Sequence, residues 1–126
     1  MRGAAWTGPR RFNGGGGLTD KLLIKTGRNY HFVNKNDIHF IESERNYARI
    51  YCENRTYLVK RSLGFLEEKL GEDKFMRVNR SALVNVERIH EMKEEDNNNY
   101  IIILNNNKVL RWGRRYRERL VKLSRI

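Results

Sequence analysis

Short runs of apolar residues, separated by polar turns, extend along most of the chain. Residues 22–24 and 30–33 form two such runs on either side of Gly27, which is the pattern of a β-hairpin. Asparagines occupy many of the later turns, where they tolerate left-handed backbone conformations. Further runs of strand length lie at 38–41, 47–51, 56–59, 75–78, 89–92, 100–104 and 108–112. The pattern predicts a mainly β fold, rich in strands, with one or two short helices.

One segment has helical rather than alternating spacing. Leu63, Leu66 and Leu70 recur at the spacing of one helix face, Ser62 can cap the start, and Gly71 can end the helix. A helix is therefore predicted over residues 63–70. The same approach predicts a single turn at residues 81–86 and a basic amphipathic helix over 114–125.

The expected core consists of apolar residues from these strands and from the helix. We expect the following to be buried: Leu23, Ile38, Phe40, Ile41, Ile50, Leu58, Leu63, Leu66, Leu70, Phe75, Val84, Ile89, Ile101, Ile103 and Leu110.

The first 17 residues differ in composition from the rest. They hold six of the ten glycines and the only proline, Pro9. A run of four glycines at 14–17 has no side chains to bury. We interpret residues 1–17 as a flexible Gly-rich linker or a cloning-derived tail, and residues 18–126 as one folded domain.

Charge narrows the functional classes. Lys and Arg total 26 against 15 Asp and Glu, which gives a formal net charge of +11 and favours polyanionic partners. Cys52 is the only cysteine, so neither an intramolecular disulfide nor a cysteine-based zinc site is expected. No apolar run approaches the length of a membrane span, and the start lacks the pattern of a signal peptide. We expect a cytoplasmic protein with no membrane partner.

Candidate catalytic groups are few. The three histidines stand on expected strands with no carboxylate at ligand spacing: His31, His39 and His90. The glycine run near the start lacks the Lys and Ser or Thr of a phosphate-binding loop. The carboxylates near the polar clusters are interpreted as solvated strand ends or helix surface: Glu42, Glu44, Glu67 and Glu68. The sequence predicts no enzyme activity, no cofactor and no metal.

Basic residues cluster beside the expected turns. Three arginine-rich segments lie at 45–55, 77–80 and 111–125, and Lys60 and Arg61 precede the helix. Arginine presents a planar fork of donors that can pair with guanine in the major groove or grip phosphate. A solvated surface is the simpler interpretation of any one cluster, but three such clusters in a small β domain favour nucleic acid.

Four ordered blocks resemble the LytTR family of DNA-binding domains. Residues 37–47 resemble its strand pattern of isoleucine, any residue, an aromatic, isoleucine and glutamate, followed shortly by Asn and Tyr. Residues 57–70 are similar to its strand and helix, and residues 75–85 to its most diagnostic stretch. Residues 112–116 resemble its closing segment. Together the blocks run from residue 37 to residue 116 and extend the resemblance over about residues 20 to 126.

The resemblance implies an elongated stack of small antiparallel β-sheets of LytTR type with a helix at the side. It also implies that loops, rather than a recognition helix, enter successive major grooves and bend the duplex. The family's DNA contacts, carried over by position, fall on Arg45, Asn46, Arg49, Arg77, Asn79, Arg80, Arg114 and Arg115.

We hypothesise separate roles for these residues. Arg80 and Arg115 are expected to reach base edges, and the other arginines are expected to hold phosphates: Arg45, Arg49, Arg77 and Arg114. An internal salt bridge is an open alternative for Arg77.

Two residues depart from the family pattern. Asn79 stands where the family usually has His, and Gly113 where it usually has Ser. Both departures put the preference for particular DNA sequences in question more than DNA binding itself.

The implied role is the output half of a bacterial response regulator in a two-component system. The expected partners are double-stranded promoter DNA with imperfect direct repeats, a second copy on the same site, and an N-terminal receiver-type domain absent from this chain. Two other classes of protein stay open. One is a basic β-barrel that binds RNA or single strands, and the other is a signalling domain that binds an acidic protein.

Overall fold

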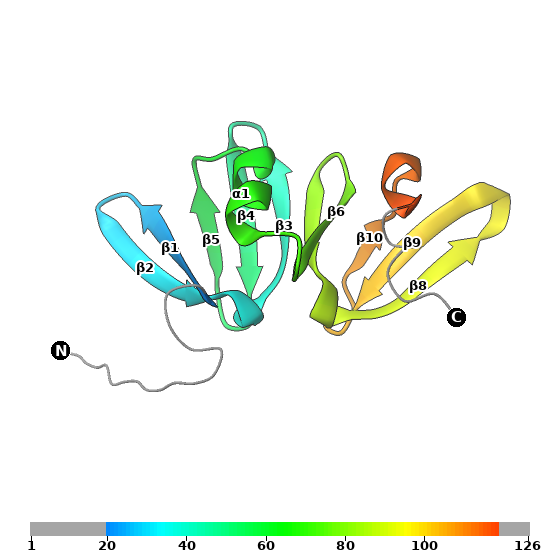
Figure 1. Cartoon of the computed structure of the whole chain (residues 1–126), viewed down its shortest axis with the longest axis horizontal. Coiled ribbons are helices and arrows are strands. Elements are labelled where there is room, and N and C mark those ends of the chain that lie inside the picture. Colours follow the sequence, from blue (N-terminus) through cyan, green and yellow to red (C-terminus); the bar gives the residue numbers. More distant parts are fainter. Residues whose placement is uncertain (1–19, 119–126) are drawn as a thin grey trace. The chain divides into compact units, whose positions relative to one another are not determined.

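The computed structural model describes residues 20–118, which form two units (Figure 1). The predicted tail at 1–17 lies outside the described residues. The first unit ends at Asp37 and contains one antiparallel hairpin, β1 (Lys21–Thr26) and β2 (Asn29–Asn34). Gly27 takes a φ of 63° in its turn, a conformation that suits glycine. Ile24 and Val33 are buried, whereas Leu23 is 53% exposed, so the expectation of a core Leu23 was wrong.

The second unit, from Ile38 onward, is built on a five-stranded antiparallel sheet in the order β5-β4-β3-β7-β6. Pairing of β3 with β7 brings together segments that lie about forty residues apart in the sequence, with Glu42 opposite Ala82. The strands are β3 (Ile38–Glu44), β4 (Tyr47–Cys52), β5 (Thr56–Val59), β6 (Phe75–Asn79) and β7 (Ala82–Asn85).

A smaller antiparallel sheet follows in the order β10-β9-β8, made of β8 (Ile89–Glu95), β9 (Asn99–Leu104) and β10 (Val109–Arg111). Short 3-10 turns lie between or after the strands of residues 21–118: η2 (Lys35–Asp37), η3 (Val86–Arg88), η4 (Asp96–Asn98) and η5 (Arg114–Tyr116).

The predicted helix is present as α1 (Leu63–Leu70), with Leu63, Leu66 and Leu70 buried. The Ser62 hydroxyl accepts a hydrogen bond of 3.0 Å from the Phe65 amide and caps the first turn. At the other end the Gly71 amide donates to the Glu67 carbonyl, and the φ of Gly71 is 81°.

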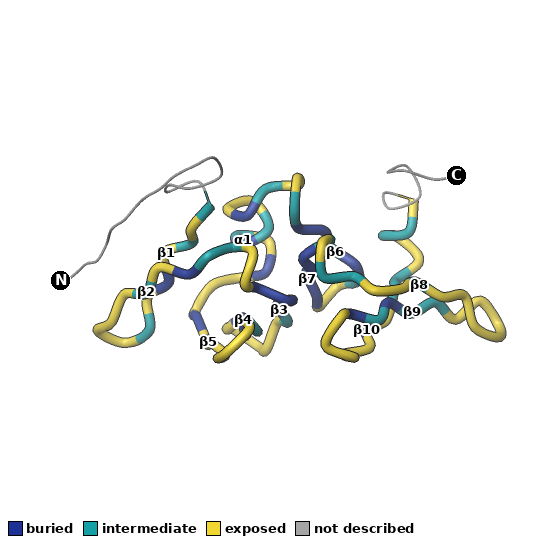
Figure 2. Tube along the Cα trace, turned by 90° about the horizontal axis from the view of Figure 1, so that it is seen from below, coloured by how far each residue is buried: buried dark blue, intermediate teal, exposed yellow. Residues whose placement is uncertain are grey.

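The core of the second unit lies on both sides of the five-stranded sheet. On one side Phe40, Val78 and Val84 pack with Ile102 and Leu104 of the smaller sheet. The intervening residues of β3 and β7 point to the opposite side, where α1 packs against β3, β6 and β7. Figure 2 shows the buried trace concentrated on these central strands.

Several sequence-based expectations about strands and buried residues in this unit were wrong. Residues 81–86 do not form a single turn, because Ala82 to Asn85 form β7 and are buried on both faces. In β9 the buried residues are Ile102 and Leu104 rather than Ile101 and Ile103. Leu58 lies on the edge strand β5 and is 39% exposed.

Within the predicted helix at residues 114–125, Arg114–Tyr116 form a 3-10 turn and residues 117–118 are α-helical. The remainder of that expected helix, from residue 119, lies outside the described residues. No helix within residues 20–118 is both long enough and apolar enough to cross a membrane. The mainly β class, with several small antiparallel sheets and helix α1 beside them within residues 20–118, is confirmed.

Candidate nucleic-acid interface

One end of the five-stranded sheet collects basic residues from separate parts of the chain. Strands β3, β5 and β6 end there, and β4 and β7 begin there, as their antiparallel register requires. The loops at this end therefore lie side by side, at the upper side of Figure 1. We call the cationic side chains of this end the basic rim: Arg45, Arg49, Lys60, Arg61, Arg80, Arg114 and Arg115.

The turn between β3 and β4 consists of Arg45 and Asn46, and both residues are exposed. Glu44 pairs with Tyr47, so the turn has only two residues and needs a left-handed conformation in its centre. Arg45 supplies it with a φ of 61°, although glycine or asparagine adopts this region at lower cost. An arginine in this place is therefore costly for folding.

Arg49 lies two residues inside β4, and its side chain is only 35% exposed. Its Nη2 atom donates to Glu44 Oε2 at 2.6 Å, diagonally across the β3–β4 hairpin. The hydrogen bond and charge of Glu44 raise the pKa of Arg49 above its ordinary value. Arg49 is thus held beside the turn by a carboxylate that competes with any phosphate.

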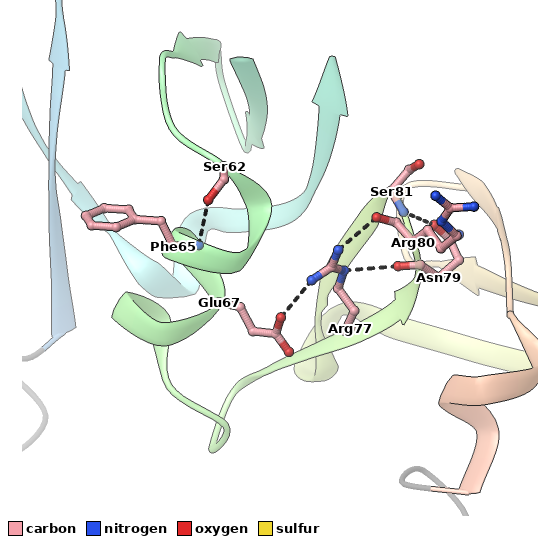
Figure 3. A network of polar contacts seen from close by, with 7 residues as sticks. All are labelled: Ser62, Phe65, Glu67, Arg77, Asn79, Arg80 and Ser81. Atoms are coloured by element: carbon pink, nitrogen blue, oxygen red, sulfur yellow. Dashed lines mark hydrogen bonds and ion pairs between the residues drawn. The ribbon is translucent and has the colours of Figure 1, made fainter. Parts of the chain in front are cut away.

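The loop between β6 and β7 is held by internal hydrogen bonds (Figure 3). Arg77 Nε donates to the Asn79 carbonyl at 3.1 Å, and Arg77 Nη2 donates to the Arg80 carbonyl at 2.8 Å. Arg77 Nη1 lies 2.8 Å from Glu67 Oε1, so the internal salt bridge considered for Arg77 is present. The Ser81 amide donates to Asn79 Oδ1 at 2.7 Å.

Arg80 stands at the tip of this loop and is exposed. Among residues 20–118, its backbone carbonyl takes part in the hydrogen bonds described above, while no hydrogen bond or ion pair is found for its guanidinium. The loop is therefore fixed by its neighbours and presents Arg80 to solvent.

The same loop is joined to the segment that carries Arg114 and Arg115. Asn79 Nδ2 donates to the Arg111 carbonyl at 2.7 Å, and the Gly113 amide donates to the Val78 carbonyl at 2.7 Å. A Cβ atom on Gly113 would lie 3.1 Å from the Tyr116 ring and 3.4 Å from the Val78 carbonyl oxygen, so the segment approaches β6 closely. Arg114 and Arg115 in η5 are both exposed.

The structure thus brings the predicted residues together at one end of the second unit, with two different kinds of environment. Arg45, Asn46, Arg80, Arg114 and Arg115 are exposed. Polar groups of the other three form internal hydrogen bonds: Arg49, Arg77 and Asn79.

Two features of this end were not included in the sequence-based site. Lys60 and Arg61 follow β5 and lie beside the β3–β4 turn, because Val59 pairs with Ala48. The Arg61 guanidinium stacks 4.3 Å from the centre of the Phe65 ring. The sequence shows that Lys60 and Arg61 precede the helix, but their place in the basic rim depends on the strand order. Glu67, interpreted as helix surface, is instead the partner of Arg77.

A second polar cluster lies at the opposite end of the sheet. Buried His39 Nε2 is 3.0 Å from Glu53 Oε1, and Arg88 Nη1 is 3.2 Å from the same oxygen. An open cavity of about 560 Å³ adjoins this cluster and is also lined by Tyr51 and Lys108. No group of three or more His, Cys, Asp or Glu within residues 20–118 is arranged to hold a metal ion. Burial and the charge of Glu42 raise the pKa of Tyr51.

Comparisons with known proteins agree on one family. The family model described as LytTr DNA-binding domain matches residues 28–125. The chain is 32% identical over 73 residues to the sensory transduction protein LytT of Bacillus subtilis (strain 168), a match that spans 58% of this chain and 30% of that protein. Among solved structures, the LytTr DNA-binding domain of a putative methyl-accepting/DNA response regulator from Bacillus cereus superposes with a TM-score of 0.72 at 23% identity. That superposition covers 82% of this chain and 95% of the other.

Proposed function

The chain belongs to the family of LytTr DNA-binding domains, and we propose that it recognises specific duplex DNA with the basic rim of its second unit. The observation that carries this proposal is the convergence of three loops, from residues 45–46, 79–81 and 111–115, at one end of one sheet. Exposed arginines project from all three loops. Arginines on loops that are held by hydrogen bonds within the protein are suited to contact the phosphate backbone and base edges in a groove.

Different rim residues are assigned different roles according to their environments. Arg80 and Arg115 are exposed on short, well-anchored loops, which suits guanine recognition by a guanidinium fork. Arg45, Asn46 and Arg114 are assigned to phosphates or nearby base edges. Arg49 reaches a phosphate only if Glu44 releases it.

Asn79 and Arg77 are assigned a smaller role in direct contact with DNA. Both ends of the Asn79 amide are already used within the protein, and three nitrogens of Arg77 are engaged. This revises the expectation that both residues bind DNA directly. Lys60 and Arg61 are added as further phosphate contacts, because the strand order places them beside Arg45.

In the cell we propose that the domain regulates transcription as the output half of a bacterial response regulator. The matched region covers under a third of LytT, which is named as a sensory transduction protein. An N-terminal receiver-type domain, a second copy on imperfect direct repeats of promoter DNA, and a cytoplasmic location belong to the same proposal.

The test is a selection from random duplex DNA at about physiological salt, with wild type, Arg80→Ala and Arg115→Ala in parallel. Wild type should enrich a repeated motif, and each variant should lose base preference at one position by roughly 1–3 kcal/mol. Arg55→Ala is the matched control, because Arg55 is an exposed arginine at the opposite end of the sheet. If no motif is enriched and all variants bind every sequence alike, specific readout is refuted.

One observation favours a second candidate, which is single-strand binding. Tyr30 and Phe32 lie on the same face of β2 and are 63% and 65% exposed, with Lys25 Nζ 5.6 Å from the centre of the Tyr30 ring. Exposed aromatics beside cations are the usual platform for unstacked bases. Competition between duplex, single-stranded DNA and RNA probes decides between the candidates. Duplex should win, and Tyr30→Ala with Phe32→Ala should leave duplex affinity unchanged.

A further inference from the structure

The loop that carries Arg80 has no regular backbone pairing at its tip, yet it is fixed by a side chain from the strand before it. Arg77 donates to two consecutive carbonyls of this loop, those of Asn79 and Arg80. The third interaction of the same guanidinium is with Glu67 in α1 (Figure 3). The guanidinium presents its donors in fixed directions on three separate nitrogens, whereas the ammonium of a lysine is one compact charge with rotatable donors.

The burial of this network favours a structural use. The Arg77 side chain is 22% exposed and the Glu67 side chain 29% exposed, so the pair is largely withdrawn from solvent. Hydrogen bonds with an ionised donor and acceptor are stronger in such places than at an open surface. Arg77 therefore holds the loop, and Glu67 fixes the orientation of the guanidinium.

We infer that Glu67 and Arg77 are positioning residues for base recognition, and that α1 is coupled through them to the DNA-contacting loop. This inference rests on the proposed function, because it assigns Arg80 to a base edge. The inference gives Glu67, a negatively charged residue, a role in DNA recognition by a strongly basic domain. Glu67 improves DNA recognition although its charge repels DNA.

The charge of Glu67 and its positioning role can be separated by two quantities, the affinity for DNA in general and the discrimination between the selected motif and random duplex. Simple electrostatics predicts that removal of a carboxylate strengthens DNA binding, because the protein becomes more positive. Positioning predicts that Glu67→Ala weakens discrimination between the selected motif and random duplex. Glu68→Ala is the matched control, since Glu68 is an exposed neighbour on the same helix and the change of charge is identical.

The first measurement does not involve DNA. Amide hydrogen exchange of Ser81, whose amide is bonded within the loop, should be about tenfold faster in Glu67→Ala than in wild type, and unchanged in Glu68→Ala. Unchanged exchange in Glu67→Ala overturns the positioning role, whatever the DNA results are.

The second measurement is the ratio of affinities for motif and random duplex. It should fall about tenfold in Glu67→Ala and stay at the wild-type value in Glu68→Ala. Faster exchange with an unchanged ratio overturns the link to recognition. If wild type selects no motif, the proposed function fails, while the exchange result still decides the structural half.

Two milder variants keep the test valid if Glu67→Ala is poorly folded. Glu67→Gln keeps an acceptor for Arg77 without the charge, and Arg77→Lys keeps the charge without the fork. Both should show a smaller change of the same sign in exchange and in the affinity ratio.

Discussion

The amide of Asn79 donates a hydrogen bond of 2.7 Å to the backbone carbonyl of Arg111, 32 residues later in the chain. The oxygen of the same amide accepts from Ser81, so a single side chain ties the β6–β7 loop to the end of the smaller sheet. The two segments that carry the proposed DNA contacts are thereby joined to each other.

Replacement of Asn79 by alanine should lower the free energy of unfolding by about 1–3 kcal/mol, because two hydrogen bonds are lost in a half-buried place. Urea denaturation measures this change. Asn106→Ala is the control, since the Asn106 side chain accepts one local bond, from the Lys108 amide, and its loss should cost less. Equal effects of the two substitutions would argue against a special role for Asn79.

Arg45 has a φ of 61° in a two-residue turn, which is unfavourable for a residue with a Cβ atom. Arg45→Gly should therefore raise the free energy of unfolding by up to about 1 kcal/mol while it weakens DNA binding. Denaturation and duplex titration of the same sample check both signs. A variant that loses stability would show that the arginine is not strained in this turn.

Glu44 holds Arg49 by a hydrogen bond of 2.6 Å. Glu44→Gln should release Arg49 for phosphate and remove a negative charge, so duplex affinity should rise and the salt slope should steepen by about 1. Glu94→Gln, on the exposed strand β8, makes the same change of charge away from Arg49. The prediction fails if the two variants bind DNA equally well.

Salt dependence separates phosphate contacts from base contacts. If about six phosphates are neutralised, the logarithm of the affinity should fall against the logarithm of the salt concentration with a slope near −5. Arg114→Ala should reduce the slope by about 1, and Arg80→Ala should change base preference instead. Titrations at several salt concentrations with selected and random duplexes give both quantities.

Gly113 begins η5 without a side-chain cap, and the family pattern has serine there. Gly113→Ala should destabilise the fold by about 1 kcal/mol, because the new Cβ atom crowds the Tyr116 ring at 3.1 Å. Gly113→Ser meets the same crowding but can cap the turn, so thermal unfolding should show it about 1 kcal/mol more stable than the alanine variant. Equal melting temperatures for the two variants would exclude a cap.

The predictability of the fold depended on how local each signal was. Helix α1 was predictable because its cap at Ser62, its leucine spacing and its end at Gly71 all lie within ten residues. Strand β7 was missed because both of its faces are buried, which removes the alternation that identifies a strand at the surface. In β9 the cause is different: the apolar run at residues 101–104 has no alternation in sequence, so the sequence does not show that Ile102 and Leu104 face the core.

The candidate site was predictable as a set of residues but not as a surface. Arginines beside turns, and the four blocks that resemble the family, named the set. Its order in space, with Lys60 next to Arg45 and Arg45 next to Arg80, follows from long-range strand pairing. The engagement of Arg77 by Glu67 likewise depends on packing between a helix and a strand ten residues apart, which no local pattern encodes. The DNA contacts themselves stay a prediction.

Pairing of β3 with β7 also links DNA binding to folding thermodynamics. The rim exists only when Glu42 and Ala82, forty residues apart, have come together, so an unfolded chain has no assembled binding surface. Specific DNA should therefore act as a stabilising ligand, and at a hundredfold excess over its dissociation constant it should add about 2.7 kcal/mol to the free energy of unfolding. Substitutions in the core that never approach DNA, such as Leu83→Ala, should then reduce apparent affinity by lowering the folded population.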